Sequence, residues 1–332
     1  NQMNIKTNKN IENKSGYTIA HADCVHRLHI IENIVDHVPE LLQQPVESKD
    51  FYFYPTANYE QQFLIEQIQN YTKHPNSEDI LLTAGSDGAL KLICDTFITS
   101  SSRLLFFVPT YPNMIQFIQT TGSLTPSLLN TPLMKKTENM EEKISEELVS
   151  QNYDFVYICS PNLPLGHTVS VEWVQKTVKK YPNTVFIIDE AYMEYCEQKS
   201  CSSLSIQNLL ITRTFSKAFG LAGLRIGYCM GPLVERLRVI YNCKSVTLTA
   251  IKSASICLKH INHYKNHLKK LKESRKLLQK CLPELVGSGK MIFDFDIPDA
   301  AWFFIYCLNT SKVLEIFRNS GIMVRDKSIQ KQ

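Results

Sequence analysis

The feature that most constrains the fold is the alternation of short, continuous apolar runs with amphipathic helical patterns between residues 60 and 230. Continuous apolar runs are typical of strands that are buried on both faces of a parallel sheet. Helical patterns between such strands favour a mostly parallel sheet flanked by helices, in an α/β fold. We expect strands at 80–83, 103–108, 155–159, 184–188, 209–212 and 225–230, and helices at 60–73, 86–98, 113–121, 141–150 and 170–180.

The pattern changes after about residue 232, where a long helical stretch continues to about residue 282. Two strand-like runs, 291–295 and 302–308, and a short helix that ends near Gly321 follow it. This order of elements predicts a smaller α+β domain that a long helix connects to the preceding part of the chain. We therefore expect a large domain over 51–240, and a small domain formed by 1–50, which includes an N-terminal arm, and 241–332.

Composition excludes several classes of protein. The chain has 332 residues, 44% of them hydrophobic, and a net charge of +4, so it can bury a sizeable core. No apolar run reaches the ~18 residues that span a bilayer, and the first 16 residues lack the apolar stretch of a signal peptide. The ten cysteines are scattered and form no C-x-x-C pair, which is typical of reduced core cysteines. We expect a cytoplasmic protein without a metal site.

Glycine is scarce, and the positions where it occurs are informative. Seven of the 12 glycines fall in three short stretches, and glycine is needed where the backbone bends sharply or approaches a ligand. The first stretch, Thr-Ala-Gly-Ser-Asp-Gly at 83–88, opens a predicted helix. Free N–H groups and the dipole at a helix N-terminus favour phosphate, so Gly85, Ser86 and Asp87 are candidates to bind an anion. An ordinary Ser or Asp helix cap is the alternative.

Two further groups of polar residues follow predicted strands, whose carboxyl ends hold the ligand in open α/β sheets. Asp189 comes directly after an apolar strand, where a carboxylate is costly to bury without a cationic partner. Its alternative is a helix cap or a surface loop residue. Lys217 follows Thr214 and Ser216, and Arg225 lies eight positions further on. Hydroxyls, a lysine and an arginine in one apolar stretch suit a bound phosphate better than a solvated surface.

These residues carry a resemblance to a known family. The stretch TFSKAFGLAGLRIGY, residues 214–228, resembles the cofactor-lysine motif of fold-type I pyridoxal-phosphate aminotransferases, most closely the histidinol-phosphate aminotransferase-like branch. Five other pieces follow the order of that family: TAGSDGAL, VPTYPNM, CSPNLPLG, IIDEAY and GIMVRD. The resemblance extends from Tyr54 to Asp326. It implies the fold-type I architecture, with a large and a small domain, and pyridoxal 5′-phosphate as the cofactor.

The resemblance also implies a role for each matching residue. Lys217 forms a Schiff base with the cofactor aldehyde and then shuttles a proton. Asp189 pairs with the pyridine nitrogen, Tyr192 donates a hydrogen bond to the phenolic oxygen, and Tyr111 stacks on the ring. Tyr54 of the neighbouring subunit reaches the phosphate, which implies a homodimer. The remaining phosphate-binding residues implied are Gly85, Ser86, Asp87, Thr214, Ser216 and Arg225.

The chain departs from the family pattern in three places. The family usually has Asn-Asn-Pro-Thr-Gly where residues 162–166 read Asn-Leu-Pro-Leu-Gly, and Leu163 cannot donate a hydrogen bond to the phenolic oxygen. Asn162 is the candidate to donate this hydrogen bond instead. If it does not, we expect an altered pKa for the Schiff base between the cofactor and Lys217. The family has an N-terminal Asn-Glu-Asn-Pro-like segment that lines the substrate pocket. This chain lacks it, and residues near 21–24, His-Ala-Asp-Cys, take its place. Arg325 matches the first of two substrate-binding arginines, and the second has no counterpart in this sequence.

The function implied is pyridoxal-phosphate-dependent transamination between an amino donor and a 2-oxo acid, the donor being an amino acid or an amino-alcohol phosphate such as histidinol phosphate. The same lysine, aspartate and phosphate cup also suit a decarboxylase or lyase acting on a phosphorylated amino acid, or a catalytically degenerate relative. The basic stretch 265–280 could bind nucleic acid or a membrane, but its leucine spacing indicates a solvated helix face. We expect neither partner, and interpret His260, His263 and His267 as exposed polar residues.

Overall fold

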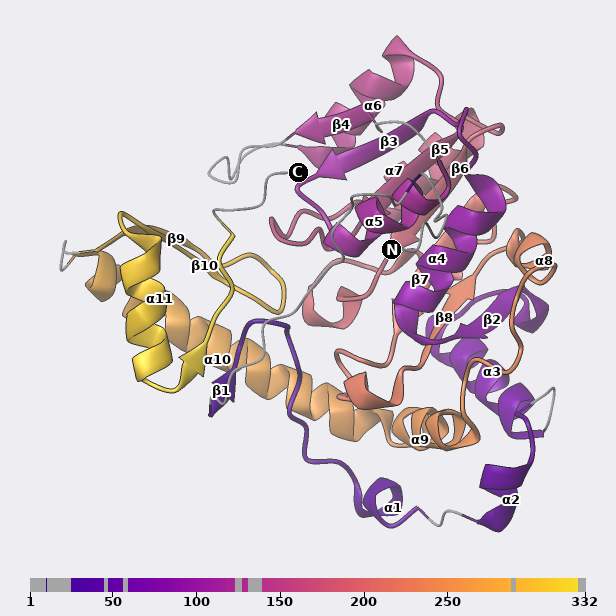
Figure 1. Ribbon diagram of the computed structural model, residues 1–332, viewed down its shortest axis with the longest axis horizontal. Helices are drawn as coiled ribbons and strands as arrows, with labels where there is room; N and C mark the ends of the chain where they lie inside the picture. The colour runs from indigo at the N-terminus through magenta and orange to yellow at the C-terminus, as the bar shows by residue number, and fades with distance from the viewer. Residues whose placement is uncertain are drawn as a thin grey trace, which may run out of the picture.

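The computed structural model describes residue 10 and residues 25–44, 47–55, 59–122, 127–130, 139–287 and 291–327. A seven-stranded sheet in the order β2-β8-β7-β6-β5-β3-β4 forms its centre (Figure 1). Strand β8 runs antiparallel to both of its neighbours, and the other pairs are parallel. The strands are β2 (Ile80–Thr83), β3 (Leu104–Val108), β4 (Ser127–Asn130), β5 (Phe155–Cys159), β6 (Val185–Asp189), β7 (Leu209–Thr214) and β8 (Gly227–Met230).

Helices cover both faces of this sheet, as the apolar runs predict. One buried cluster contains Ile93 and Met114 of the helices together with Phe106 of β3, and a second contains Ile144 and Val174 from helices on the other side. The expectation of an α/β protein with a mostly parallel sheet is therefore confirmed. The flanking helices are α3 (Tyr59–Thr72), α4 (Gly85–Phe97), α5 (Pro112–Thr120), α6 (Met140–Ser150) and α7 (Val171–Lys180).

Three details of the secondary-structure prediction were wrong. The strand expected at 225–230 begins at Gly227, because Arg225 has the left-handed φ of 51° and cannot continue a strand. Strand β4 was missed, since its sequence Ser-Leu-Leu-Asn has only two apolar residues. The stretch 232–282 is not one helix but three, α8 (Val234–Leu237), α9 (Leu248–Lys259) and α10 (Ile261–Gly287). A new helix starts at α9 because the Thr247 hydroxyl caps it by accepting from the amide of Ala250 at 3.2 Å.

The C-terminal elements lie beyond the far end of α10, away from the large sheet (Figure 1). Strands β9 (Ile292–Asp296) and β10 (Phe304–Cys307) form an antiparallel pair, followed by α11 (Thr310–Asn319). Strand β11 (Ile322–Met323) pairs in parallel with β1 (His26–Arg27), so the two ends of the described chain lie side by side. Helices α1 (Pro39–Leu42) and α2 (Ser48–Tyr52) follow β1.

Some expectations fall outside the part of the chain that the structure describes. Residues 21–24, the predicted replacement for the Asn-Glu-Asn-Pro-like segment, are among these, as are most of the first 16 residues. Among the described residues, no helix has the length and apolar character needed to cross a membrane.

Candidate functional site

A cavity of about 830 Å³ lies between the carboxyl ends of the large sheet's strands and two distant segments, 27–33 and 301–327. It brings together most of the residues singled out from the sequence. Gly85 lies directly beside this set, whereas Asn162 and Tyr54 do not line the cavity. The predicted residues that line it are Ser86, Asp87, Tyr111, Asp189, Tyr192, Thr214, Ser216, Lys217, Arg225 and Arg325.

Lys217 lies in the turn after β7 with its ammonium nitrogen in this cavity. The nitrogen donates to the carbonyl oxygens of Ile30 at 3.0 Å and Ile31 at 3.4 Å, and it lies 5.3 Å from the ring centre of Tyr192. Burial lowers the pKa of Lys217 to about 8, because the charged form is poorly solvated there. About a tenth of this amine is therefore uncharged at pH 7, far more than for an ordinary lysine, and the uncharged form is the one that a nucleophile or a proton-accepting base requires.

Asp189 is the last residue of β6 and is 2% exposed. Its carboxylate accepts hydrogen bonds from the hydroxyl of Tyr157 at 2.7 Å, the hydroxyl of Thr212 at 3.0 Å and the amide of Ala191 at 3.3 Å. Burial raises the pKa of Asp189 to about 6, and the three donors oppose that rise. A buried carboxylate held in this way is suited to a basic ring nitrogen, whose proton would complete its set of partners.

A cup of hydrogen-bond donors lies beside Lys217, at the N-terminus of α4. The residue before the helix is Ala84, which has no side-chain oxygen to cap the first amides of the helix. Arg225 reaches the same place and donates to the Ser216 hydroxyl at 3.3 Å. Thr214 donates to Ser216 at 3.0 Å, so both hydroxyls belong to the cup. Amides at a helix N-terminus, hydroxyls and a guanidinium together fit a phosphate.

Glycine is required at position 85 by the geometry of this cup. Gly85 has a φ of 71°, and a Cβ there would lie 2.8 Å from Nη2 of Arg225. Asp87, in the first turn of α4, has its carboxylate 3.4 Å from the same guanidinium nitrogen. The side chain of Asp87 therefore orients Arg225, and the absence of a side chain at Gly85 leaves room for it.

Tyr111 and Tyr192 supply aromatic surface to the cavity. The hydroxyl of Tyr111 donates to Asp87 at 2.8 Å, and burial raises the pKa of Tyr111 well above its ordinary value. The ring of Tyr192 packs edge-on against Trp302, with 4.9 Å between the ring centres. Burial also raises the pKa of Tyr192, which keeps its hydroxyl protonated and able to donate.

The loop after β5 places Leu163, rather than Asn162, at the cavity. Asn162 is fully buried, and its side-chain amide donates to the carbonyl of Pro109 at 3.2 Å while its oxygen accepts from the amide of Leu165 at 3.2 Å. Both ends of this side chain thus hold the loop together. Leu163 presents only hydrocarbon to the cavity.

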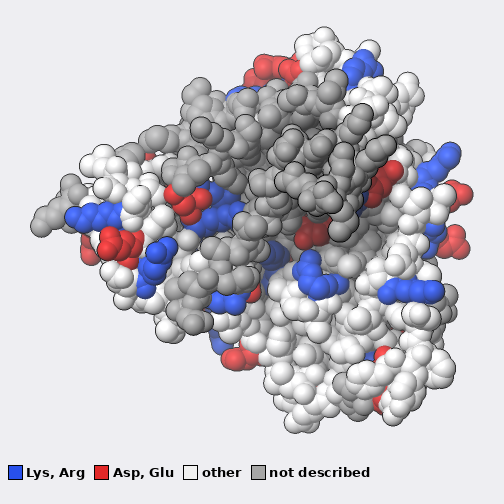
Figure 2. All heavy atoms as spheres, in the orientation of Figure 1, with Lys and Arg blue, Asp and Glu red and all other residues white. Residues whose placement is uncertain are grey.

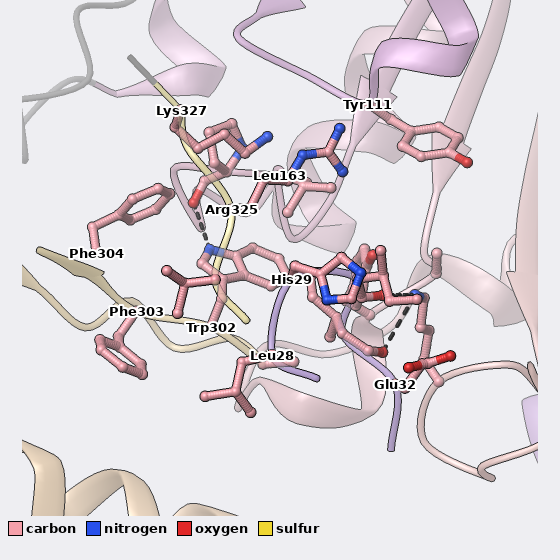
Figure 3. Close-up of a pocket in the computed structure, with 18 of the residues that line it drawn as sticks. Leu28, His29, Glu32, Tyr111, Leu163, Trp302, Phe303, Phe304, Arg325 and Lys327 are labelled. Atoms are coloured by element: carbon pink, nitrogen blue, oxygen red, sulfur yellow. Dashed lines mark hydrogen bonds between the residues drawn. The ribbon is translucent and has the colours of Figure 1, made fainter. Parts of the chain in front are cut away.

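The remaining wall comes from segments that the sequence analysis did not single out. Figure 3 shows Trp302, Phe303 and Phe304 on one side of the cavity and Tyr111 on the other, with His29 between them. The indole nitrogen of Trp302 donates to the carbonyl of Pro164, which ties this wall to the loop after β5. The sequence offered one signal for this wall, since Trp302 is one of only two tryptophans in the chain.

Arg325 lies on this wall and is joined there by Lys327, two positions further on. Burial lowers the pKa of Lys327 to about 8, and the neighbouring charge of Arg325 acts in the same direction. Two cationic side chains of the C-terminal segment therefore line the cavity.

Tyr54 lies on the surface of this chain, 70% exposed, with Nζ of Lys244 4.3 Å from its ring centre. It has exposed aromatic neighbours at the end of α2, directly after α2 and at the start of α3. The exposed side chains here are Phe51, Tyr52, Phe53, Tyr54 and Tyr59.

The basic stretch of α10 is interrupted by acidic partners. Lys272 pairs with Glu197 at 2.7 Å and Arg275 with Asp299 at 2.5 Å. Acidic and basic side chains are likewise interspersed on the face of the molecule in Figure 2. No group of three His, Cys, Asp or Glu in the described ranges is arranged to hold a metal ion.

The three histidines of this region are exposed or half-buried, and each contacts α1 or the segment before it. His260 bonds to Glu40 at 2.6 Å, and His267 bonds to Asn33 at 2.9 Å. His263 bonds to the carbonyl of Asp36 at 2.5 Å. They therefore hold the N-terminal segment that passes over Lys217.

Together these groups fit pyridoxal 5′-phosphate. Lys217 matches its aldehyde, Asp189 its basic ring nitrogen, and the cup around Arg225 its phosphate. The fit rests on features of this chain: an amine of lowered pKa, a buried carboxylate, and a cup in which a Cβ at Gly85 would collide with the guanidinium.

Comparison with known proteins agrees with this chemistry. The family model for aminotransferase class I and II matches residues 30–328. The chain is 30% identical, over 88% of its length and 78% of the other protein, to a dihydroxyacetone phosphate transaminase of Campylobacter jejuni. It is 28% identical to histidinol-phosphate aminotransferase 1 of Archaeoglobus fulgidus, over 90% of this chain and 88% of that one.

Solved structures show the same fold. The histidinol-phosphate aminotransferase of Sinorhizobium meliloti, in complex with pyridoxal-5′-phosphate, superposes with a TM-score of 0.76 at 22% identity, covering 91% of this chain and 83% of that one. An aspartate aminotransferase tetra mutant of Thermus thermophilus gives a TM-score of 0.76 at 14% identity, covering 96% of this chain and 90% of the other.

Proposed function

Because the chain belongs to the class I and II aminotransferases, which depend on pyridoxal phosphate, we propose that it transfers the amino group of an amino acid or an amino-alcohol phosphate to a 2-oxo acid in this cavity. The observation that carries the proposal is the position of the Lys217 amine, whose pKa is lowered to about 8, between the Tyr192 ring and the cup around Arg225. When bound, the cofactor supplies an electron sink for the carbanion at the substrate's α-carbon.

The proposed roles follow from the local geometry. Lys217 would carry the cofactor, and its freed amine would then take the proton from the substrate's α-carbon and deliver it to the cofactor carbon that carried the aldehyde. Asp189 holds the proton on the ring nitrogen, because its buried carboxylate is stabilised by such a partner. Tyr192 donates from its hydroxyl to the phenolic oxygen, and Tyr111 covers one face of the ring.

We propose that the cup at the start of α4 binds the cofactor phosphate. Arg225 supplies the charge, Thr214 and Ser216 supply hydroxyls, and the first amides of the helix supply further donors. The amides in question belong to Gly85, Ser86 and Asp87.

The amino donor is proposed to carry an anionic group that contacts Arg325. Arg325 and Lys327 line the cavity, and the aromatic wall of Trp302, Phe303 and Phe304 suits the apolar part of a substrate. Two of the relatives are named for phosphate-bearing substrates, histidinol phosphate and dihydroxyacetone phosphate, which supports a phosphate as that group.

We also propose a homodimer in which Tyr54 reaches the phosphate cup of the neighbouring subunit. The exposed aromatic cluster around Tyr54 supports this, because such patches commonly form protein interfaces. Mixing a Lys217→Ala variant with a Tyr54→Phe variant is the test. If Tyr54 acts across the interface, hybrid dimers regain one intact site and the mixture is more active than either parent. Activity equal to the average of the parents would contradict the shared site.

Two coarser proposals concern organisation and location. We propose a large domain over 51–240 and a small domain of 1–50 with 241–332, since β9, β10 and α11 lie apart from the large sheet (Figure 1), although α9 packs against α3. We propose that the enzyme works in the cytoplasm, because the described cysteines are unpaired thiols.

The central assignment is tested by borohydride reduction of the protein with bound cofactor, followed by peptide mapping. The pyridoxyl group is expected on the peptide that carries Lys217. A Lys217→Ala variant should lose this label, whereas Lys265→Ala, at an exposed lysine of α10, should keep it. Labelling at another lysine in the wild-type protein would overturn the assignment.

The reaction type is tested with 2-oxoglutarate as the amino acceptor. Transamination of histidinol phosphate or an amino acid is expected to yield glutamate in amounts equal to the donor consumed. Release of carbon dioxide or elimination products without glutamate would identify a decarboxylase or lyase instead, and no turnover of any donor would identify a degenerate relative.

A further inference from the structure

Asp189 has a partner that the proposed reaction does not use. Tyr157 lies on β5, and its hydroxyl donates to Oδ2 of Asp189 at 2.7 Å. The side chain of Tyr157 is fully buried. Neither the sequence patterns nor the roles proposed above assign it a function.

Strand register explains why the two side chains meet. Tyr157 pairs with Ile187, and Cys159 pairs with Asp189, so Tyr157 and Asp189 are diagonal neighbours on the same face of the sheet. On its other side Tyr157 pairs with Phe106 of β3, and the two rings lie 5.4 Å apart. Packing therefore fixes the ring of Tyr157 and aims its hydroxyl at Asp189.

Tyr157 stays protonated and able to donate at neutral pH, because burial raises its pKa well above the ordinary value. Within the described part of the chain, Tyr157 is the donor to Oδ2 of Asp189, while Thr212 and Ala191 donate to Oδ1. Loss of the Tyr157 hydroxyl would thus leave a buried carboxylate oxygen without a donor, which disfavours the ionised form.

We propose that Tyr157 is a positioning residue that fixes the Asp189 carboxylate at the cavity. It acts through Asp189 and does not itself touch the substrate. The proposal rests on the proposed function, in which Asp189 pairs with the cofactor's ring nitrogen. Because Leu163 supplies no donor at the phenolic oxygen, the chain depends the more on Asp189 to polarise the ring.

The test follows the titration of Asp189 in the cofactor-free protein. Below pH 6 the folded state takes up a proton on Asp189 that the unfolded state takes up only near pH 3.8, so acidification stabilises the fold through this group. The free energy of unfolding is measured in urea between pH 5 and 8 for each protein and for the same protein with Asp189→Asn. The difference between the two curves is the contribution of Asp189, and its midpoint reports the pKa of Asp189 in the folded state. The titratable groups that face Asp189 are Tyr157 and Cys159 of β5, Tyr111 before α5, Tyr192 after β6, and Asp87 of α4.

Tyr157→Phe is expected to move the midpoint of this Asp189-dependent change upward by about one pH unit, the effect of losing one hydrogen bond to the charged form. Tyr228→Phe is the matched control, since Tyr228 is a buried strand tyrosine that packs against Phe215. It should leave the midpoint unchanged. Equal midpoints in wild type and Tyr157→Phe, or an equal shift in Tyr228→Phe, would overturn the proposal.

A second readout uses the enzyme with bound cofactor. Tyr157→Phe is expected to lower kcat about tenfold, while KM for the amino donor stays within about twofold, because the residue acts on the ring and not on substrate binding. A change in KM alone would contradict this. Should the protein bind no pyridoxal phosphate while the midpoint shifts as expected, the proposed function fails and the link between Tyr157 and Asp189 stands.

Discussion

The two walls of the cavity are built in different ways. The wall that we propose to hold the cofactor, here called the cofactor wall, comes from the ends of neighbouring strands in one sheet, and its residues Asp189, Thr214 and Ser216 are buried. The wall that we propose to hold the substrate, here called the substrate wall, comes from segments 27–33 and 301–327, which are distant in sequence, and Arg325 on it is exposed. The first wall is fixed by strand register, and the second depends on contacts such as that of Trp302 with Pro164.

This difference separates the chemistry from the choice of substrate. Groups that must hold their geometry within fractions of an ångström, such as Lys217 and Asp189, follow buried strands. Groups that select a substrate lie on elements that tolerate exchange, since few of their backbone bonds belong to the large sheet. Substitutions in the cofactor wall should therefore have larger effects on the free energy of unfolding or of binding than substitutions in the substrate wall.

The largest effect is expected for the charge of Lys217. Its pKa is lowered to about 8, so between pH 8 and 10.5 the unfolded state binds the proton that the folded state has released. The free energy of unfolding should rise with pH over this window, by up to about 3 kcal/mol. Urea unfolding of the cofactor-free protein and of Lys217→Met measures the difference. Lys265→Met, at an exposed position, should retain the wild-type slope.

The next effect concerns the phosphate cup. Arg225→Gln removes a charged donor from the cup and should weaken pyridoxal phosphate binding by about 1.5 to 3 kcal/mol, roughly tenfold to 150-fold. Equilibrium dialysis of the cofactor measures it. Arg236→Gln, at an exposed site on α8, serves as the control and should bind the cofactor as wild type does. Equal loss in both variants would mean that the cup does not bind the phosphate.

A smaller effect is expected on the substrate wall. Arg325→Gln should raise KM for an anionic amino donor about tenfold and leave kcat within about twofold, because an exposed charge contributes mainly to substrate binding. Steady-state kinetics with a phosphorylated and an unphosphorylated donor measure the change. An equal change for both donors would contradict a contact with the phosphate.

The smallest effect is expected at Leu163. Leu163→Asn places an amide donor at the cavity, which should stabilise the phenolate form of the bound cofactor. The pH midpoint of the cofactor's absorbance is then expected to fall by less than about one unit. Leu165→Asn, in the same loop and outside the cavity, is the control. A midpoint that rises or does not change would show that position 163 does not reach the phenolic oxygen.

Sequence patterns singled out residues that the structure brings together at one wall of the cavity, and the reason is physical. Strands buried on both faces give unbroken apolar runs, and the residues after them lie at one edge of the sheet, as Asp189 and Lys217 do. The contacts of His260 with Glu40 and of His267 with Asn33 were not predicted, because each joins positions more than 200 residues apart. Local patterns do not contain such pairings.

The sequence by itself determined the α/β class and the family, and it singled out Lys217 and the residues proposed for the cup, because each follows from local periodicity or a contiguous motif. Only the tertiary structure decided that Lys327 joins Arg325 at the cavity, that Leu163 faces it in place of Asn162, and that Tyr157 holds Asp189. Strand register and the docking of distant segments set these contacts, and both depend on how the whole chain packs.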